Sequence, residues 1–235
     1  MPVKKSSQSN AAEAEKLAPT RGPRPSLSKK QIAITAIRIA DNEGLAAVTM
    51  QRVAREVGLT TMALYRYFPG KSALMALMID SVADSPPPFG KGGSPWTARL
   101  KEWAHRCLAI YEAHPWFLEA TTARQSPMGP NELAWIEAAV GMLTETGLKP
   151  KMRHHAFMAI IGHVRGHATF LQARQSDGAG RDRTGELAEA VHQEPDRYPA
   201  LLEVLRSGAL RESAGAFNFG LVCILEGIRA HVSAT

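Results

Sequence analysis

The chain has 235 residues, of which 45% are hydrophobic and 21% charged, so it is long enough for one large or two modest globular domains. Its net charge is +6, and residues 1–30 hold most of the excess, with seven Lys or Arg against two Glu. No apolar run follows the basic start and none reaches about 18 residues, so we expect no secretory signal, no membrane span and a cytoplasmic location. Cys107 and Cys223 are expected to be buried, reduced thiols rather than a disulfide.

The N-terminus predicts a basic arm followed by a helix. Residues 1–27 are rich in Ser, Ala, Lys and Pro and show no apolar periodicity, which is typical of disorder. Ser28 and Gln31 then have the spacing of a capping box, and apolar residues follow at helical intervals until Gly44. The basic arm has two interpretations that the sequence leaves open, a DNA-contacting extension and a solubilising tail.

Residues 49–68 match the helix-turn-helix pattern, in which two short helices are joined through a turn after a longer helix. Thr49 and Thr60 can cap the two helices, and the second is expected to run through Phe68. Gly58 suits the turn between them because a larger residue would strain it. A fourth helix is predicted over residues 72–83, which gives a helical domain over residues 28–84.

The second of these short helices carries side chains suited to DNA. Its inward residues include Leu64, and Phe68 is also expected in the core. Hydroxyls and helix N-terminal amides bind phosphate oxygens, and small apolar side chains pack on thymine methyl groups. We predict outward positions for Thr61, Met62, Ala63, Tyr65, Arg66 and Tyr67. Gln51 is expected to reach a base edge and Lys71 a flanking phosphate.

The segment "TMQRVAREVGLTTMALYRYFPGKSALM" (49–75) resembles the DNA-binding signature of the tetracycline-repressor (TetR) family. The similarity extends over residues 28–84. It implies that Gln51, Thr61, Met62, Ala63, Tyr65, Tyr67 and Lys71 match positions that touch DNA in the family. Tyr67 departs from the histidine that is frequent at its position.

The segment "SPPPFGKGGSP" (85–95) cannot form regular structure and is predicted to link two domains. Beyond it, breaks at Gly and Pro separate segments with helical periodicity, and alternation suited to strands is absent, so the expected class is all-α. The predicted helices cover roughly residues 96–113, 115–123, 130–147, 150–174, 184–193, 198–207 and 213–232. Stretches such as "HPWFLEA" and "FNFGLVCILEGIRA" are similar to the tetracycline-repressor-type C-terminal domain, which implies ligand binding and dimerisation over residues 96–235.

The helix predicted at 150–174 is apolar on two sides, so one side is expected to face its own core and the other a partner. The last helix has an apolar stripe of its own. The family resemblance implies that two such helices from each of two subunits form a four-helix interface. The predicted interface comprises Phe157, Ile161, Val164, Phe217, Leu221, Ile224, Leu225 and Ile228.

Large apolar side chains in this domain suit a hydrophobic ligand cavity: Trp103, Phe117, Trp135, Met142 and Phe157. His163 and His167 are four positions apart on one helix face, a spacing that can hold a metal. No HExxH context accompanies them, so they are interpreted as polar groups that line a cavity or interface, and no metal or cofactor is predicted.

We therefore expect a repressor that binds a palindromic operator as a homodimer and is released by a small apolar or aromatic effector. Two alternatives remain open. An all-helical enzyme would need an acid, a base and a nucleophile gathered in the C-terminal domain. A constitutive DNA-binding protein would have a filled C-terminal core rather than a cavity.

Overall fold

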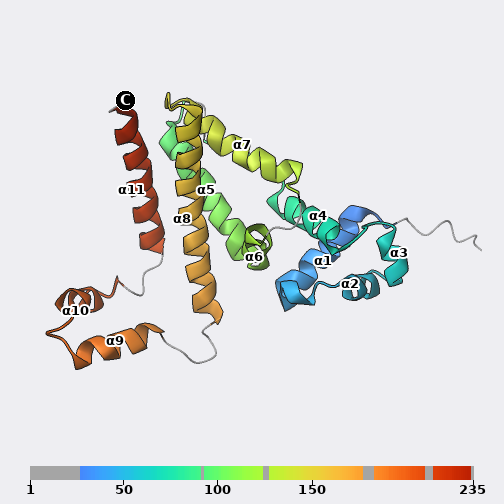
Figure 1. Cartoon of the computed structure of the whole chain (residues 1–235), viewed down its shortest axis with the longest axis horizontal. Helices are drawn as coiled ribbons and strands as arrows, with labels where there is room; N and C mark the ends of the chain where they lie inside the picture. The colour runs from blue at the N-terminus through green and yellow to red at the C-terminus, as the bar shows by residue number, and fades with distance from the viewer. Residues whose placement is uncertain (1–26, 91–92, 124–126, 177–182, 210–213, 234–235) are drawn as a thin grey trace, which may run out of the picture.

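The computed structural model describes residues 27–90, 93–123, 127–176, 183–209 and 214–233. Within these ranges all regular secondary structure is helical, which confirms the all-α class (Figure 1). The elements are α1 (Lys29–Glu43), η1 (Leu45–Ala47), α2 (Met50–Glu56), α3 (Thr61–Tyr65), α4 (Lys71–Ala83), α5 (Trp96–Ala113), α6 (Trp116–Thr122), α7 (Pro130–Thr144), α8 (Pro150–Ser176), α9 (Arg183–Gln193), α10 (Pro199–Arg206) and α11 (Ala214–Ser233). The predicted arm lies outside the described residues except for Leu27, which packs against the core.

The first three α-helices begin where their capping residues indicate. Ser28 forms a capping box with Gln31, whose amide N lies 3.1 Å from Ser28 Oγ. The hydroxyls of Thr49 and Thr60 accept hydrogen bonds from Arg52 N and Ala63 N at 3.0 and 3.2 Å. Each cap satisfies an amide that the first helical turn leaves free. The short 3₁₀ helix η1, which had not been expected, fills the connection between α1 and α2.

Helix α4 joins the N-terminal helices to the rest of the molecule (Figure 1). It packs against α1 on one side and against α6 and α7 on the other. Beyond it, α5 packs along α8, and α7 contacts both. Apart from Val191 in α9, the buried apolar residues of the described ranges form one contiguous cluster that runs from Ile32 in α1 to Leu225 in α11.

The segment between α4 and α5 has no regular structure where it is described, yet it is packed rather than free. The ring of Phe89 meets Trp135 edge to face, with centroids 5.5 Å apart. The amide of Gly90 donates to Glu102 Oε2 at 2.9 Å. These contacts fix the segment against α5 and α7.

The last three helices lie at the periphery. Helix α11 runs beside α8, and α9 and α10 pack on each other away from the main body (Figure 1). Cys107 is buried and Cys223 is exposed, and both are free thiols, so the expectation that Cys223 is buried is wrong. No helix in the described ranges is long and apolar enough to cross a membrane.

Candidate DNA-binding surface and effector pocket

The recognition helix candidate, α3, projects from a scaffold that holds it on one side. Leu64 is fully buried and Phe68 nearly so, which anchors the helix to the N-terminal core. The other side faces solvent: Met62 is 76% exposed and Tyr65 44%. Gly58 has a φ of 70°, a left-handed conformation that favours glycine, and it sets the angle between α2 and α3. A capped, anchored helix therefore presents apolar and hydroxyl-bearing side chains outward.

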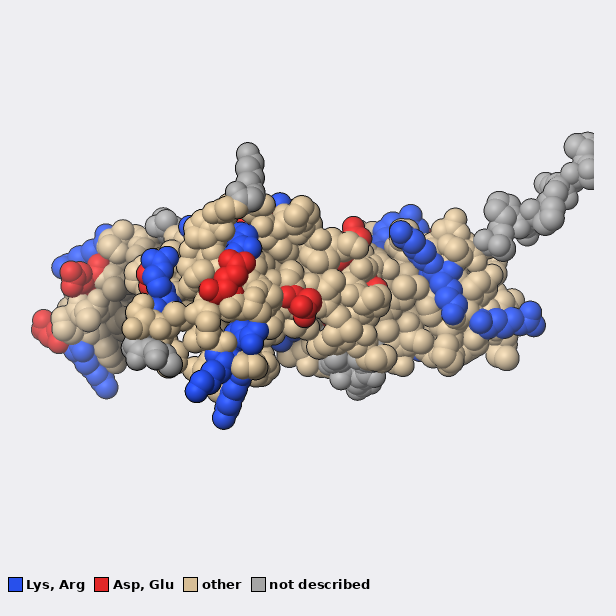
Figure 2. All heavy atoms as spheres, turned by 90° about the horizontal axis from the view of Figure 1, so that it is seen from above, with Lys and Arg blue, Asp and Glu red and all other residues tan. Residues whose placement is uncertain are grey.

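The other predicted DNA-contacting residues surround these two. Gln51, Arg66 and Lys71 are exposed, and Thr61 and Ala63 are half-buried. Lys71 is the first residue of α4, so its charge belongs to the helix end at which amides are left free. On the face drawn in Figure 2, several Lys and Arg side chains stand on the end of the molecule formed by the N-terminal helices, with little acidic surface near them.

Tyr67 differs from its expected position. Helix α3 ends at Tyr65 rather than at Phe68, so helical spacing does not fix the direction of Tyr67. Its side chain is half-buried and packs against the core.

Arg52 in α2 is held by two carboxylates. Its guanidinium donates to Glu43 Oε1 at 2.8 Å and also to Glu56 Oε2. The hydrogen bond from Arg52 lowers the pKa of Glu56, and nearby Arg38 lowers it further. This network joins the end of α1 to both ends of α2, so it braces the helix behind α3.

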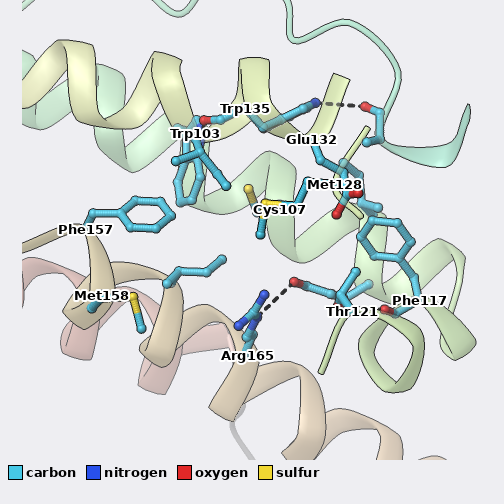
Figure 3. A pocket seen from close by; sticks show the side chains of 15 residues that line it. Trp103, Cys107, Phe117, Thr121, Met128, Glu132, Trp135, Phe157, Met158 and Arg165 are labelled. Carbon is cyan, nitrogen blue, oxygen red and sulfur yellow. Dashed lines mark hydrogen bonds between the residues drawn. The ribbon is translucent and has the colours of Figure 1, made fainter. Parts of the chain in front are cut away.

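A cavity of about 190 Å³ lies between α5, α6, α7 and α8 (Figure 3). Four of the predicted ligand-binding aromatic residues line it: Trp103, Phe117, Trp135 and Phe157. Met142 is buried in the core but does not line the cavity. The lining also includes Ala83, the last residue of α4, so the cavity reaches the helix that carries the N-terminal domain.

Hydrogen bonds fix the aromatic wall of this pocket. The indole of Trp103 donates to Trp135 O at 2.9 Å, and the indole of Trp135 donates to Ala83 O at 2.8 Å. The rings of Trp103 and Phe157 meet edge to face, with centroids 6.0 Å apart. Because both indole N–H groups are satisfied, the rings present mainly their apolar surfaces to the cavity.

Sequence reasoning missed the polar residues of the pocket. Arg165 lines it from α8, and its Nε donates to the hydroxyl of Tyr111 at 3.3 Å. Thr121 and Glu132 are buried at its edge. Burial raises the pKa of the Cys107 thiol, which also lines the pocket, so this group stays protonated. The sequence did contain a signal for Arg165, because it lies four positions after Ile161 and eight after Phe157, on the same apolar face of α8.

His163 and His167, which were predicted as ligand-binding residues or as polar groups that line a cavity or interface, do not line this pocket. His163 stacks on the ring of Phe217 in α11, with centroids 5.1 Å apart, and its Nε2 lies 2.9 Å from Phe217 O. The ring of His167 also lies 5.1 Å from that of Phe217. Both histidines therefore join α8 to α11 within one chain.

Most residues of the predicted dimer interface pack within one chain. Phe157 and Ile161 line the pocket, and Val164, Phe217, Leu221 and Leu225 are buried between helices. Ile224 and Ile228 are half-buried in a groove between α8 and α11. The side of α8 that was expected to need a partner is covered by α11, so within the predicted set only Ile224 and Ile228 keep partly exposed side chains.

Two polar contacts connect the pocket helices to the N-terminal helices. Asp80 of α4 accepts hydrogen bonds from the amides of Asn131 and Glu132 at 2.8 and 3.4 Å. It thereby caps the first turn of α7 from another helix. Gly129 permits this approach, because a Cβ there would lie 2.1 Å from Asp80 Oδ1.

The second contact involves Asp41, near the end of α1. Its Oδ1 accepts a hydrogen bond from the Trp116 indole at 2.6 Å and lies 2.8 Å from His114 Nδ1. Trp116 precedes the pocket residue Phe117, and their rings meet edge to face at 6.0 Å. Both α6 and α7 are thus tied to helices of the N-terminal domain.

Comparisons with known proteins agree with this arrangement. Residues 34–78 match the family model described as bacterial regulatory proteins, tetR family, and residues 88–232 match the tetracyclin repressor-like C-terminal domain. The chain is similar to the HTH-type transcriptional repressor DrrR1 of Streptomyces coeruleorubidus, with 35% identity over 229 residues that cover 92% of this chain and 82% of the relative.

Solved structures show the same fold. Apo ActR from Streptomyces coelicolor superposes with a TM-score of 0.77 at 25% identity, covering 90% of this chain and 99% of ActR. ActR in complex with actinorhodin gives a TM-score of 0.73 at 25% identity, with coverage of 88% and 98%. The chain belongs to the tetR family of bacterial regulatory proteins.

Proposed function

We propose that this protein is a transcriptional repressor that binds an operator through α3 and releases it when a small apolar or aromatic effector enters the pocket. The observation that carries the proposal is the direct hydrogen bond from pocket residue Trp135 to Ala83 O, at the end of α4. The same α4 begins at Lys71, beside the exposed face of α3. One helix therefore touches the pocket with one end and the DNA-binding surface with the other.

In the proposed complex, α3 enters the major groove. Met62 packs against base edges, and the Tyr65 hydroxyl and Lys71 contact phosphates on the flanks. Arg66 contributes a further cation at the end of α3. Arg52 has a bracing role, because both of its carboxylate partners neutralise it.

The operator is proposed to be palindromic because a second subunit would double a small binding surface. The surface proposed for dimerisation lies on the outer faces of α8 and α11. Phe219 is 74% exposed and Val222 is 43% exposed on α11. Gly162 and Gly166 of α8 have open space where a side chain would stand, which permits close helix approach. Two subunits joined there would present two α3 helices to half-sites about 34 Å apart or a multiple of it.

Release is proposed to follow from the ties between the pocket and α4. An effector that spreads the aromatic wall displaces α7, and Asp80 and Ala83 transmit this movement to α4. By linkage, operator DNA must weaken effector binding by the same factor. The cavity favours this reading over a constitutive DNA-binding protein, and the ActR complexes with actinorhodin and (S)-DNPA support ligand binding in such a domain.

The test is to select genomic fragments on the purified protein and then to screen metabolites and drugs for release of the bound fragment. The proposal expects enriched fragments that share an inverted repeat and at least one apolar or aromatic compound that releases them. Absence of any sequence preference among bound fragments would contradict DNA recognition, and release by no compound would favour the constitutive alternative. Binding to an operator in chromosomal DNA fits the proposed cytoplasmic location.

A further inference from the structure

The effector pocket contains a cation whose charge no side chain neutralises within the described part of the chain. Arg165 lines the pocket, and its one described hydrogen bond joins Nε to the neutral hydroxyl of Tyr111. No carboxylate of the described residues forms an ion pair with it. On the neighbouring helix α5, by contrast, Arg99 and Arg106 each pair with a glutamate.

Such an arrangement points to the ligand as the source of the missing charge. Half-burial against apolar walls strips water from a guanidinium, and an anionic partner offsets that cost. The Tyr111 hydroxyl holds Nε and so fixes the plane of the group. The two terminal nitrogens form no hydrogen bond with a described residue, and two parallel N–H donors match the two oxygens of a carboxylate.

The opposite side of the pocket has the opposite charge. Glu132 is buried in the first turn of α7, and Figure 3 shows it across the cavity from Arg165. An anionic ligand group beside Glu132 would be repelled by the carboxylate. The same group beside Arg165 would be attracted by the guanidinium. The effect of Arg165 extends into the cavity, since it opposes the rise that burial causes in the pKa of Cys107. The rings of Trp103, Trp135 and Phe157 line the same cavity.

We propose that the effector is a flat aromatic acid whose carboxylate is bound by Arg165, with its ring system against the aromatic wall. This inference rests on the proposed function, in that it assigns the pocket to an effector. It deepens that function by naming Arg165 as the residue that determines ligand charge. Tyr111 acts as a positioning residue, because it holds the guanidinium and does not supply the charge.

The test uses anthraquinone-2-carboxylate and its neutral amide as probes, measured by isothermal titration calorimetry on the full chain. The acid is expected to bind at least about tenfold more tightly than the amide, as for a desolvated charge-assisted pair. Arg165→Gln should abolish this preference and leave the affinity for the amide nearly unchanged. Arg106→Gln is the matched control, because its guanidinium is paired with Glu102, and it should keep the preference.

A second variant covers the case in which Arg165→Gln fails to fold. Tyr111→Phe removes only the oxygen that orients the guanidinium, so it should reduce the preference for the acid about threefold. Equal affinities for acid and amide, binding of neither probe, or a preference that survives Arg165→Gln would each overturn the inference. Operator binding is measured on the same samples. If the wild type binds operator but shows no preference for the acid, the inference about Arg165 fails while the proposed function stands. If the wild type does not bind operator, the proposed function itself fails.

Discussion

The two ends of the chain expose apolar side chains in different ways. In α1–α4, each helix has a face buried within the chain, and the exposed large apolar residues are Ile34 in α1 and Met62 and Tyr65 on the short, capped α3. In α10 no described residue is buried, and α11 exposes Phe219 and Val222 although its other face is covered by α8. An anchored helix with a few exposed side chains suits a groove, whereas an exposed row along a long helix suits a partner chain.

The largest expected effect comes from comparing a buried and an exposed side chain of α3. Leu64→Ala should lower the free energy of unfolding by about 2–5 kcal/mol, because Leu64 is fully buried and its removal leaves a cavity. Met62→Ala, two positions away, should change it by less than about 0.5 kcal/mol because the side chain is largely in solvent. Urea unfolding measures both, and equal losses would show that α3 is not held as described.

At the other end, Phe219→Asp should separate the subunits of the proposed dimer. A charge in the centre of an apolar interface is expected to weaken association at least about tenfold while leaving the fold intact, because Phe219 contacts little of its own chain. Leu133→Asp, at an exposed apolar position on α7, is the control. Light scattering across a concentration series measures the change. An unaltered dimer in Phe219→Asp, or dissociation in Leu133→Asp, would place the interface elsewhere.

The connection between the two regions is tested at Asp80. Asp80→Asn weakens the cap on α7 and should lower the free energy of unfolding by about 1 kcal/mol. It should also reduce the factor by which the effector weakens operator binding, since α7 and α4 are then less firmly joined. Asp84→Asn is the control, because Asp84 Oδ1 accepts only from its neighbour Ser85. Fluorescence anisotropy with labelled operator measures the coupling, and full coupling in Asp80→Asn would contradict this route.

The smallest expected effect concerns pH. Burial lowers the pKa of His167, the neighbouring His163 lowers it further, and Glu112 opposes the change. The neutral form is therefore favoured in the folded state, so this contribution to stability is complete above about pH 6.5 and is lost as the pH falls through the folded-state pKa. The Tm of His167→Gln should depend less on pH in this window than that of the wild type. The exposed His155→Gln should keep the wild-type slope.

Much of the N-terminal half was predictable because its signals are local. Ser28, Thr49 and Thr60 cap helices through residues three positions away, and Gly58 acts through its own backbone angle. The helix boundaries of the C-terminal half also followed from Gly and Pro. In the N-terminal half, the predicted end of α3 was wrong. The helix ends at Tyr65, and the amides of Tyr67 and Phe68 form turn hydrogen bonds with Leu64 O.

The faces of the C-terminal helices were not predictable in the same way. Periodicity shows that α8 is apolar on two sides, but it does not show that α11 covers one of them through Phe217. The pocket brings Arg165 and Tyr111 together from α8 and α5, and their spacing in the chain carries no signal for this. Phe89 was assigned to a linker, and only the packed structure shows its contact with Trp135. Contacts between distant segments depend on the whole packing.

The most direct test of the account compares operator with random duplex for wild type and for a Met62→Ala, Tyr65→Ala double variant. Both side chains are exposed, so the fold and its stability should persist. The ratio of operator affinity to random-duplex affinity should fall about 100-fold, as expected when two base or backbone contacts are lost. Met158→Ala, at an exposed site on α8, should keep the wild-type ratio. A double variant that is folded and retains the full ratio would contradict the assignment of α3 as the recognition helix.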